Sequence, residues 1–124
     1  MTGLRVWGTG LLALGVCADS MAVDCDPGPG AQVFQAKCAV CHSREEGQQL
    51  AGPSLYHLNG RRAGMLAGFN FSSALSESGI EWTATSLAGF IASPQTFVPG
   101  TVMPFGGLKN PAERQSLVCF LTSD

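Results

Sequence analysis

Cys38-Ala39-Val40-Cys41-His42 is the stretch of this chain that decides its interpretation. Two thiols three residues apart lie on one face of a helical turn, so both can add to the vinyl groups of one porphyrin. His42 follows at once, where it can ligate the iron from the proximal side. The pattern predicts a covalently attached haem. Redox dithiols and half zinc sites also use a CxxC spacing, so the motif alone leaves these alternatives open.

Residues 1–22 are typical of an export signal. Arg5 is the only charge before a short apolar core at Gly10–Val16, and small residues precede a peptidase site after Ala22. We expect cleavage there, which leaves residues 23–124 as one domain in a bacterial periplasm.

Two alternatives to a cleaved signal are a membrane anchor and a lipoprotein. The apolar run is shorter than the ~20 residues that a bilayer requires, which argues against stable membrane insertion. Lipidation at Cys17 is disfavoured because the bulky Val16 precedes it.

Cleavage removes Cys17 and leaves Cys25, Cys38, Cys41 and Cys119. If Cys38 and Cys41 bind haem, then Cys25 and Cys119 remain as a pair. In an oxidising compartment such a pair tends to form a disulfide, and we expect that bridge. Two buried free thiols are the alternative.

Composition excludes some classes of function. The formal net charge is −2, and Lys37 and Lys109 are the only lysines, so the basic surface of a nucleic-acid-binding protein is absent. With 16 glycines and 7 prolines, much of the chain is expected to be loop. A chain this short buries only a modest core, which a large prosthetic group at its centre would complete.

The expected fold is all-α, with about four helices and long loops around one haem. The helices are expected near residues 30–41, 72–79, 83–92 and 110–122. Ser72 and Asn110 are suitable N-caps, and Pro94 prevents the third helix from continuing. Residues 43–71 show no sustained period, which fits a segment that packs against a cofactor.

A closed haem site needs a sixth iron ligand, for which the candidates are His57, Met65 and Met103. We favour Met103 because proline and glycine in Phe97–Phe105 can hold an extended loop against the ring. A thioether ligand favours Fe(II) and raises the reduction potential. On the loop alone, Met103 could equally be a core residue.

Several motifs together resemble those of the class I c-type cytochromes, and more narrowly the mitochondrial-type subgroup found in mitochondria and alphaproteobacteria. The resemblance extends from about Gly30 to Leu121. Its motifs, in order, are Cys38–His42, Gly52–Leu55, Gly60-Arg61, Gly68-Phe69, Gly79–Trp82 and Pro99–Met103.

The resemblance implies roles for particular residues. Cys38 and Cys41 would form thioethers, and His42 and Met103 would ligate the iron. The Pro53 carbonyl would accept a hydrogen bond from the His42 ring.

It also implies that Arg61 and Trp82 help to hold a haem propionate. Without that role they would be a solvated surface arginine and a plain core tryptophan. Phe34 and Phe120 would pack where the first and last helices cross, which would bring Cys25 close to Cys119.

The implied function is that of a monomeric, periplasmic one-electron carrier with one haem c and no catalytic residues, acting between redox partner proteins. The alternatives are a haem subunit of a larger dehydrogenase or oxidase, and a peroxidase-like or gas-binding haem protein if Met103 is not a stable ligand.

The chain also departs from the subgroup. Phe71 and Phe90 replace frequent tyrosines, and the lysine ring around the haem edge is largely missing, with Gln95, Thr96 and Val102 at positions that are often basic. Docking therefore cannot depend mainly on positive charge.

Overall fold

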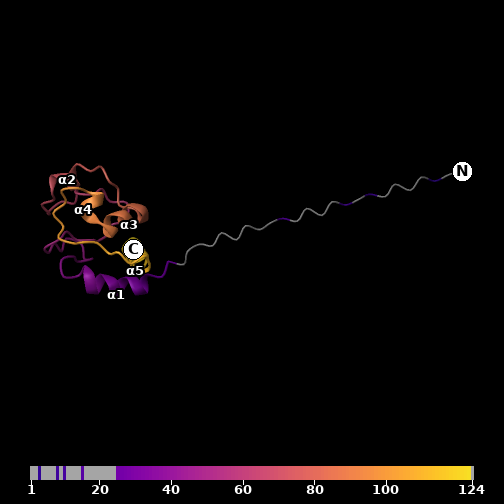
Figure 1. Ribbon diagram of the computed structural model, residues 1–124, viewed down its shortest axis with the longest axis horizontal. Helices are drawn as coiled ribbons and strands as arrows, with labels where there is room; N and C mark the ends of the chain where they lie inside the picture. Colours follow the sequence, from indigo (N-terminus) through magenta and orange to yellow (C-terminus); the bar gives the residue numbers. More distant parts are fainter. Residues whose placement is uncertain (1–2, 4–7, 9, 11–14, 16–24, 124) are drawn as a thin grey trace.

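All regular secondary structure in the described residues is helical. The computed structural model describes residues 3, 8, 10, 15 and 25–123. Its helices are α1 (Pro27–Lys37), α2 (Ser73–Ser76), α3 (Ala84–Ala92), α4 (Pro94–Phe97) and α5 (Pro111–Thr122) (Figure 1). The expected all-α class is confirmed, with five helices where about four were expected. Ala22 and Cys17, on which the signal interpretation depends, lie outside the described residues.

The first helix differs from its expected bounds at both ends. It begins at Pro27 because the Asp26 carboxylate accepts a hydrogen bond from the Gly28 N–H at 2.9 Å, and proline suits the first helical position. It ends at Lys37, so the motif Cys38–His42 occupies the turn after the helix. That turn remains helix-like, because the His42 N–H donates to the Cys38 carbonyl at 2.9 Å.

Pro94 separates two helices instead of only ending one. Thr83 and Ser86 form a reciprocal capping box at the start of α3, as the local sequence allows. The chain then breaks at Ser93, and Pro94 supplies the first residue of the short helix α4.

The core is built where α1 crosses α5, which also packs against α3 (Figure 1). The rings of Phe34 and Phe120 lie 5.5 Å apart at this crossing, which confirms that expectation. Gly30 permits the close approach, because a Cβ there would overlap the Ser116 carbonyl oxygen and lie 2.7 Å from the Phe120 Cβ.

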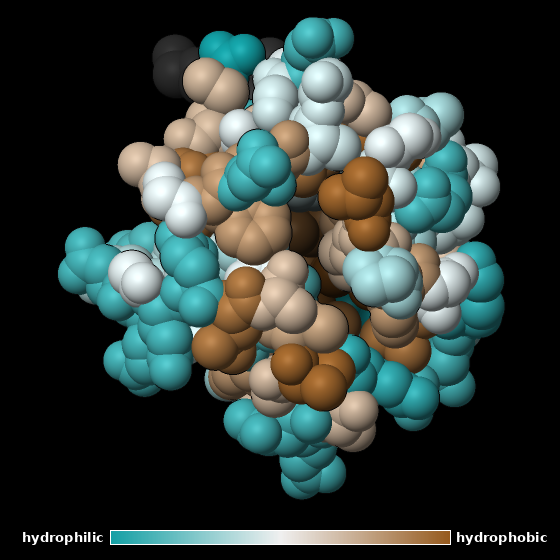
Figure 2. Space-filling model, turned by 90° about the vertical axis from the view of Figure 1, so that its left-hand side faces the viewer, coloured by the Kyte–Doolittle hydropathy of each residue, from teal (hydrophilic) through white to brown (hydrophobic). Residues whose placement is uncertain are grey.

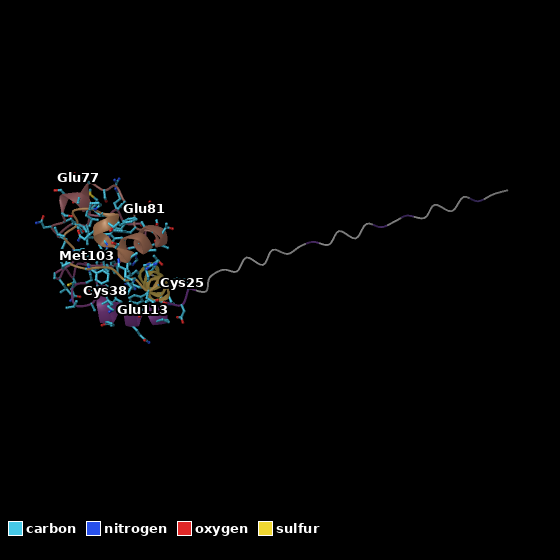
Figure 3. The ribbon with its side chains drawn as sticks, viewed as in Figure 1. Cys25, Cys38, Glu77, Glu81, Met103 and Glu113 are labelled. Carbon is cyan, nitrogen blue, oxygen red and sulfur yellow. A yellow bond between two sulfur atoms is a disulfide. The ribbon has the colours of Figure 1, made fainter. Side chains whose placement is uncertain are left out.

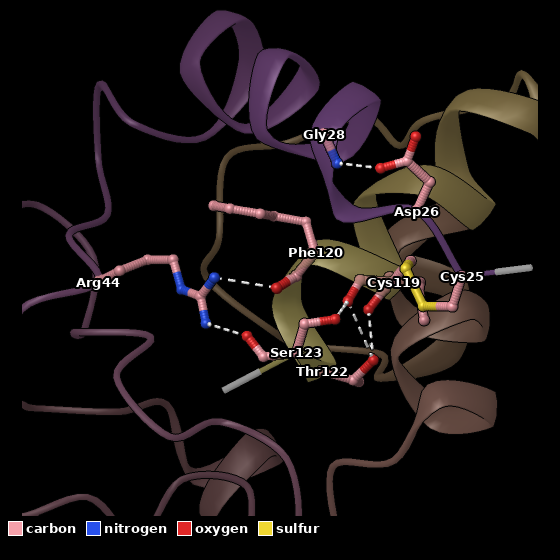
Figure 4. The surroundings of a disulfide bond; sticks show 9 residues. Cys25, Asp26, Gly28, Arg44, Cys119, Phe120, Thr122 and Ser123 are labelled. Carbon is pink, nitrogen blue, oxygen red and sulfur yellow. Dashed lines mark hydrogen bonds between the residues drawn. A yellow bond between two sulfur atoms is a disulfide. The ribbon is translucent and has the colours of Figure 1, made fainter.

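Two contacts tie α5 to distant parts of the chain (Figure 4). Cys25 and Cys119 are joined as a disulfide with their Cα atoms 5.5 Å apart. Arg44 donates to the Phe120 carbonyl at 2.9 Å, and its guanidinium lies 4.4 Å from the centre of the Phe120 ring. The C-terminal end of α5 is thereby fixed to the segment that follows the cysteine motif.

Candidate cofactor-binding site

A mostly apolar cavity of about 290 Å³ opens on the face shown in Figure 2, where a hollow lies among hydrophobic residues. Its walls come from the loops before α2 and after α4, from α2, α3 and α5, and from the last residue of α1. The seven residues to which the resemblance gives a role at the haem line it: Cys38, Cys41, His42, Pro53, Arg61, Trp82 and Met103. Apolar side chains that complete the walls include Leu55, Leu58, Leu75, Leu87, Phe90, Ile91, Leu117 and Leu121.

The two thiols of the motif are free, unlike those of Cys25 and Cys119. Burial, with a smaller contribution from the neighbouring Cys41, raises the pKa of the Cys38 thiol to about 11. Zinc sites and redox dithiols both use the thiolate, which this environment disfavours. Within the described residues, no group of three or more His, Cys, Asp or Glu side chains forms a metal site. The surroundings of Cys38 therefore disfavour the thiolate that both alternatives require.

The His42 ring is oriented by the segment that follows the motif. Its Nδ1 lies 2.7 Å from the Pro53 carbonyl oxygen and donates to it, which leaves Nε2 as the nitrogen available to a metal. Burial and the nearby Arg61 lower the pKa of His42, although the bond to Pro53 opposes them. The neutral ring, which is the form that binds iron, is thus favoured.

Arg61 and Trp82 are brought together by backbone hydrogen bonds between two loop segments. The Trp82 N–H donates to the Arg61 carbonyl at 2.9 Å, and the Gly60 N–H donates to the Trp82 carbonyl at 2.7 Å. The Arg61 guanidinium donates to the carbonyls of Ser54 at 2.8 Å and Tyr56 at 3.1 Å. Arg61 is half-buried, and this burial lowers its pKa. It is therefore not a fully solvated surface residue.

Of the three candidate sixth ligands, only Met103 lines the cavity; His57 and Met65 are exposed and lie outside it. Figure 3 shows Met103 and Cys38 on the same side of the domain. The Met103 carbonyl accepts hydrogen bonds from the Phe105 N–H at 2.9 Å and from the Gln95 amide at 3.3 Å. The loop that carries Met103 is thus attached to α4.

The sequence did not predict two contacts that shape this site. Gly52 lies against the His42 ring, where a Cβ would be 2.7 Å from Nδ1. Gln95 holds the Met103 loop. The glycine before Pro53 was a usable signal for the first contact, whereas nothing local to Gln95 indicates the second.

Comparison with known proteins supplies the deciding observation. The model of the family described as cytochrome c matches residues 28–123. The chain belongs to the cytochrome c family. It is 39% identical over 100 residues to cytochrome c of Cochliobolus lunatus, and the alignment covers 80% of this chain and 93% of that protein. It is 44% identical over 86 residues to cytochrome c2 iso-2 of Magnetospirillum fulvum, covering 69% and 90% of the two chains.

This cytochrome c family member is a monohaem electron carrier and not an enzyme, and its cofactor is one covalently attached haem c. The cavity fits that cofactor, because it combines two free thiols, an imidazole with one oriented nitrogen and a thioether on largely apolar walls. Like other members of the family, it passes electrons to redox partners. None of the helices in the described ranges combines the length and apolarity that crossing a membrane requires.

Proposed function

We propose that the protein carries single electrons between periplasmic or membrane-bound redox partners, with its iron held by His42 and Met103. The observation that carries this proposal is the meeting of Cys38, Cys41, His42 and Met103 on one apolar cavity, although Met103 is 61 positions beyond His42. A haem c bound there would supply reversible one-electron chemistry between Fe(III) and Fe(II).

The residues of the chain would attach, orient and shield that group. Cys38 and Cys41 would hold it through thioether bonds, while the Pro53 carbonyl keeps the His42 ring in one tautomer. Arg61 and Trp82 would hold a propionate, because a half-buried guanidinium reduces the cost of placing a carboxylate near the apolar cavity.

Export to the periplasm is part of the proposal. A bacterial relative named cytochrome c2 is compatible with that compartment. The pairing of Cys25 with Cys119 also suits an oxidising compartment, and we infer that this bond forms in the exported protein. Cleavage after Ala22 and a monomeric state complete the proposal.

The bracing of the Met103 loop favours an electron carrier over a peroxidase-like or gas-binding protein, which needs an open iron position. Hydrogen bonds from Gln95 and Phe105 to the Met103 carbonyl hold the backbone of the residue whose thioether lines the cavity. A haem subunit of a larger dehydrogenase or oxidase would use the same site, and the native mass of the protein extracted from its host distinguishes that case from a free carrier.

Mass spectrometry of the acid-unfolded protein tests the attachment. The mature chain should retain the mass of one haem after unfolding, because two thioether bonds survive denaturation. A double variant, Cys38→Ala with Cys41→Ala, should lose the haem into acidic organic solvent, whereas Cys25→Ser with Cys119→Ser should retain it. Extraction of the haem from the wild-type protein would contradict the proposal.

A further inference from the structure

We propose that the mouth of the cavity is a docking surface for a redox protein whose own face is apolar and weakly charged, so that association does not depend on electrostatic steering. We define this apolar rim as Val40, Ala51, Val102 and Pro104, the exposed apolar residues that line the cavity. The inference rests on the proposed function, because it identifies the kind of partner that the same site serves.

Two aliphatic side chains of the rim are highly exposed. Val40 is 81% exposed and Val102 is 72% exposed. Both line the cavity, although they are far apart in the sequence. In Figure 2 the hydrophobic residues gather around the central hollow, whereas hydrophilic residues dominate the periphery of that face. Val40 and Val102 are the two most exposed large hydrophobic residues among those described, and both line the cavity, which points to a partner that covers its mouth.

The charge around the same opening is small. Lys37 and Arg62 are the exposed charged residues that line the cavity, and no acidic residue lines it among those described. The third basic residue of the lining, Arg61, is half-buried and would hold a haem propionate. The mouth therefore lacks the strong field of one sign that accelerates association with an oppositely charged partner.

These observations together define the partner by its chemistry. A partner with a strongly acidic face could pair with only two exposed cations at the mouth. A partner with a strongly basic face could pair with no acidic residue there. An uncharged apolar face would bury Val40 and Val102 and exclude water between the two cofactors. The buried cores of protein–protein interfaces contain few charged residues, and the apolar rim contains none.

Electron self-exchange tests the rim without requiring the natural partner, because a second copy of the protein presents a face of the stated chemistry. In this reaction a reduced copy gives one electron to an oxidised copy, and NMR line broadening in mixtures gives the rate. The rate should change less than about threefold between ionic strengths of about 0.01 M and about 0.15 M, over which the Debye length falls from about 30 Å to about 8 Å.

Neutral substitutions separate apolar contact from charge. Val40→Gln and Val102→Gln should each slow self-exchange at least roughly threefold, because both copies lose apolar contact area at the interface core. Leu50→Gln is the matched control: Leu50 is 45% exposed but lies outside the cavity lining, so its substitution should leave the rate unchanged. The absorption band of the methionine–iron bond should persist in Val40→Gln, because Val40 is 81% exposed and its side chain is not a proposed ligand of the iron.

A steep dependence of the wild-type rate on salt would overturn the proposal in favour of charge recognition through Lys37 or Arg62. Unchanged rates in both valine variants, or an equal loss in Leu50→Gln, would also overturn it. Each of these results leaves the carrier function intact, whereas a protein without covalent haem, or without reversible oxidation, would refute both proposals.

Discussion

The His42 ring is held by two consecutive residues, Gly52 and Pro53. The Pro53 carbonyl accepts a hydrogen bond from its Nδ1–H, and the ring lies against the backbone of Gly52. The hydrogen bond sets the tautomer, and the missing side chain of Gly52 provides the space. The proposed ligation of the iron by His42 therefore depends on a residue that contributes no functional group.

Replacing Gly52 with alanine should displace this ring. The added Cβ would lie 2.7 Å from Nδ1, which is closer than carbon and nitrogen can approach, so the ring must move from the Pro53 carbonyl. We expect a loss of roughly 1–3 kcal/mol in the free energy of unfolding of the holoprotein, measured by denaturant titration.

Gly106→Ala is the control for that experiment, because an added Cβ there meets no atom within 4 Å. It should change stability far less than Gly52→Ala. Equal effects of the two substitutions would show that the close packing of His42 on Gly52 is unimportant.

At the residue scale, the candidates that share one cavity are those for which chemistry imposes a fixed spacing or a motif gave a signal. The two thiols and His42 had to be adjacent, and Pro53 and Met103 stood in motifs that resemble a known family. The hydrogen bond from Gln95 to the Met103 carbonyl was not predicted, because it depends on how α4 packs beside a loop. No local sequence pattern indicates such a contact.

The crossing of α1 and α5 determines how the two ends of the domain meet. Gly30→Ala should destabilise it, because the new Cβ would overlap the Ser116 carbonyl oxygen and approach the Phe120 Cβ at 2.7 Å. We expect the free energy of unfolding to fall by roughly 1–3 kcal/mol, although alanine is the better helix former.

Gly28→Ala provides the comparison within the same helix. Its nearest neighbour would be the end of the Asp26 side chain at 3.2 Å, which can move. If Gly28→Ala reduced the thermal midpoint as much as Gly30→Ala, the crossing would not be the cause.

The local sequence predicted the N-terminal ends of α2 and α5 better than it predicted the number of helices. Ser72 and Asn110 cap helices as expected, since their side chains accept hydrogen bonds from the first turn. Pro94 was recognised as a stop, but its second role as the first residue of α4 was missed. Proline ends one helix and is well suited to begin another, so the sequence alone did not distinguish a loop from a new helical turn.

For the whole molecule, the bond between Cys25 and Cys119 closes a loop of 94 residues in sequence separation, and nearly all of the proposed mature chain lies within it. Such a loop restricts the unfolded chain strongly. Cys25→Ser with Cys119→Ser should therefore lower the free energy of unfolding by up to roughly 4 kcal/mol on the chain-entropy model.

The absorption spectrum of the haem is the control measurement for this prediction, because it should not change. The disulfide pair lies outside the cavity lining, so the double variant should keep the methionine–iron band and a nearly unchanged potential. Equal stability of the wild-type protein with and without a reductant that opens disulfides would argue that the bond does not form in the exported protein.

The long segment between α1 and α2 shows what sequence could and could not predict at this scale. Its lack of periodicity correctly indicated an absence of helix, and the structure places much of it on the cavity wall. The path of that segment could not be predicted, because its contacts are with a cofactor cavity and with distant carbonyls such as that of Phe120, which Arg44 reaches.

A spectroelectrochemical titration of the holoprotein and of Met103→Ala tests the central claim most directly. The wild-type protein should exchange one electron reversibly and show the methionine–iron band when oxidised. Met103→Ala should lose that band, shift to a lower potential because the soft thioether no longer favours Fe(II), and bind cyanide or CO faster. An unchanged band and potential in Met103→Ala would contradict the account.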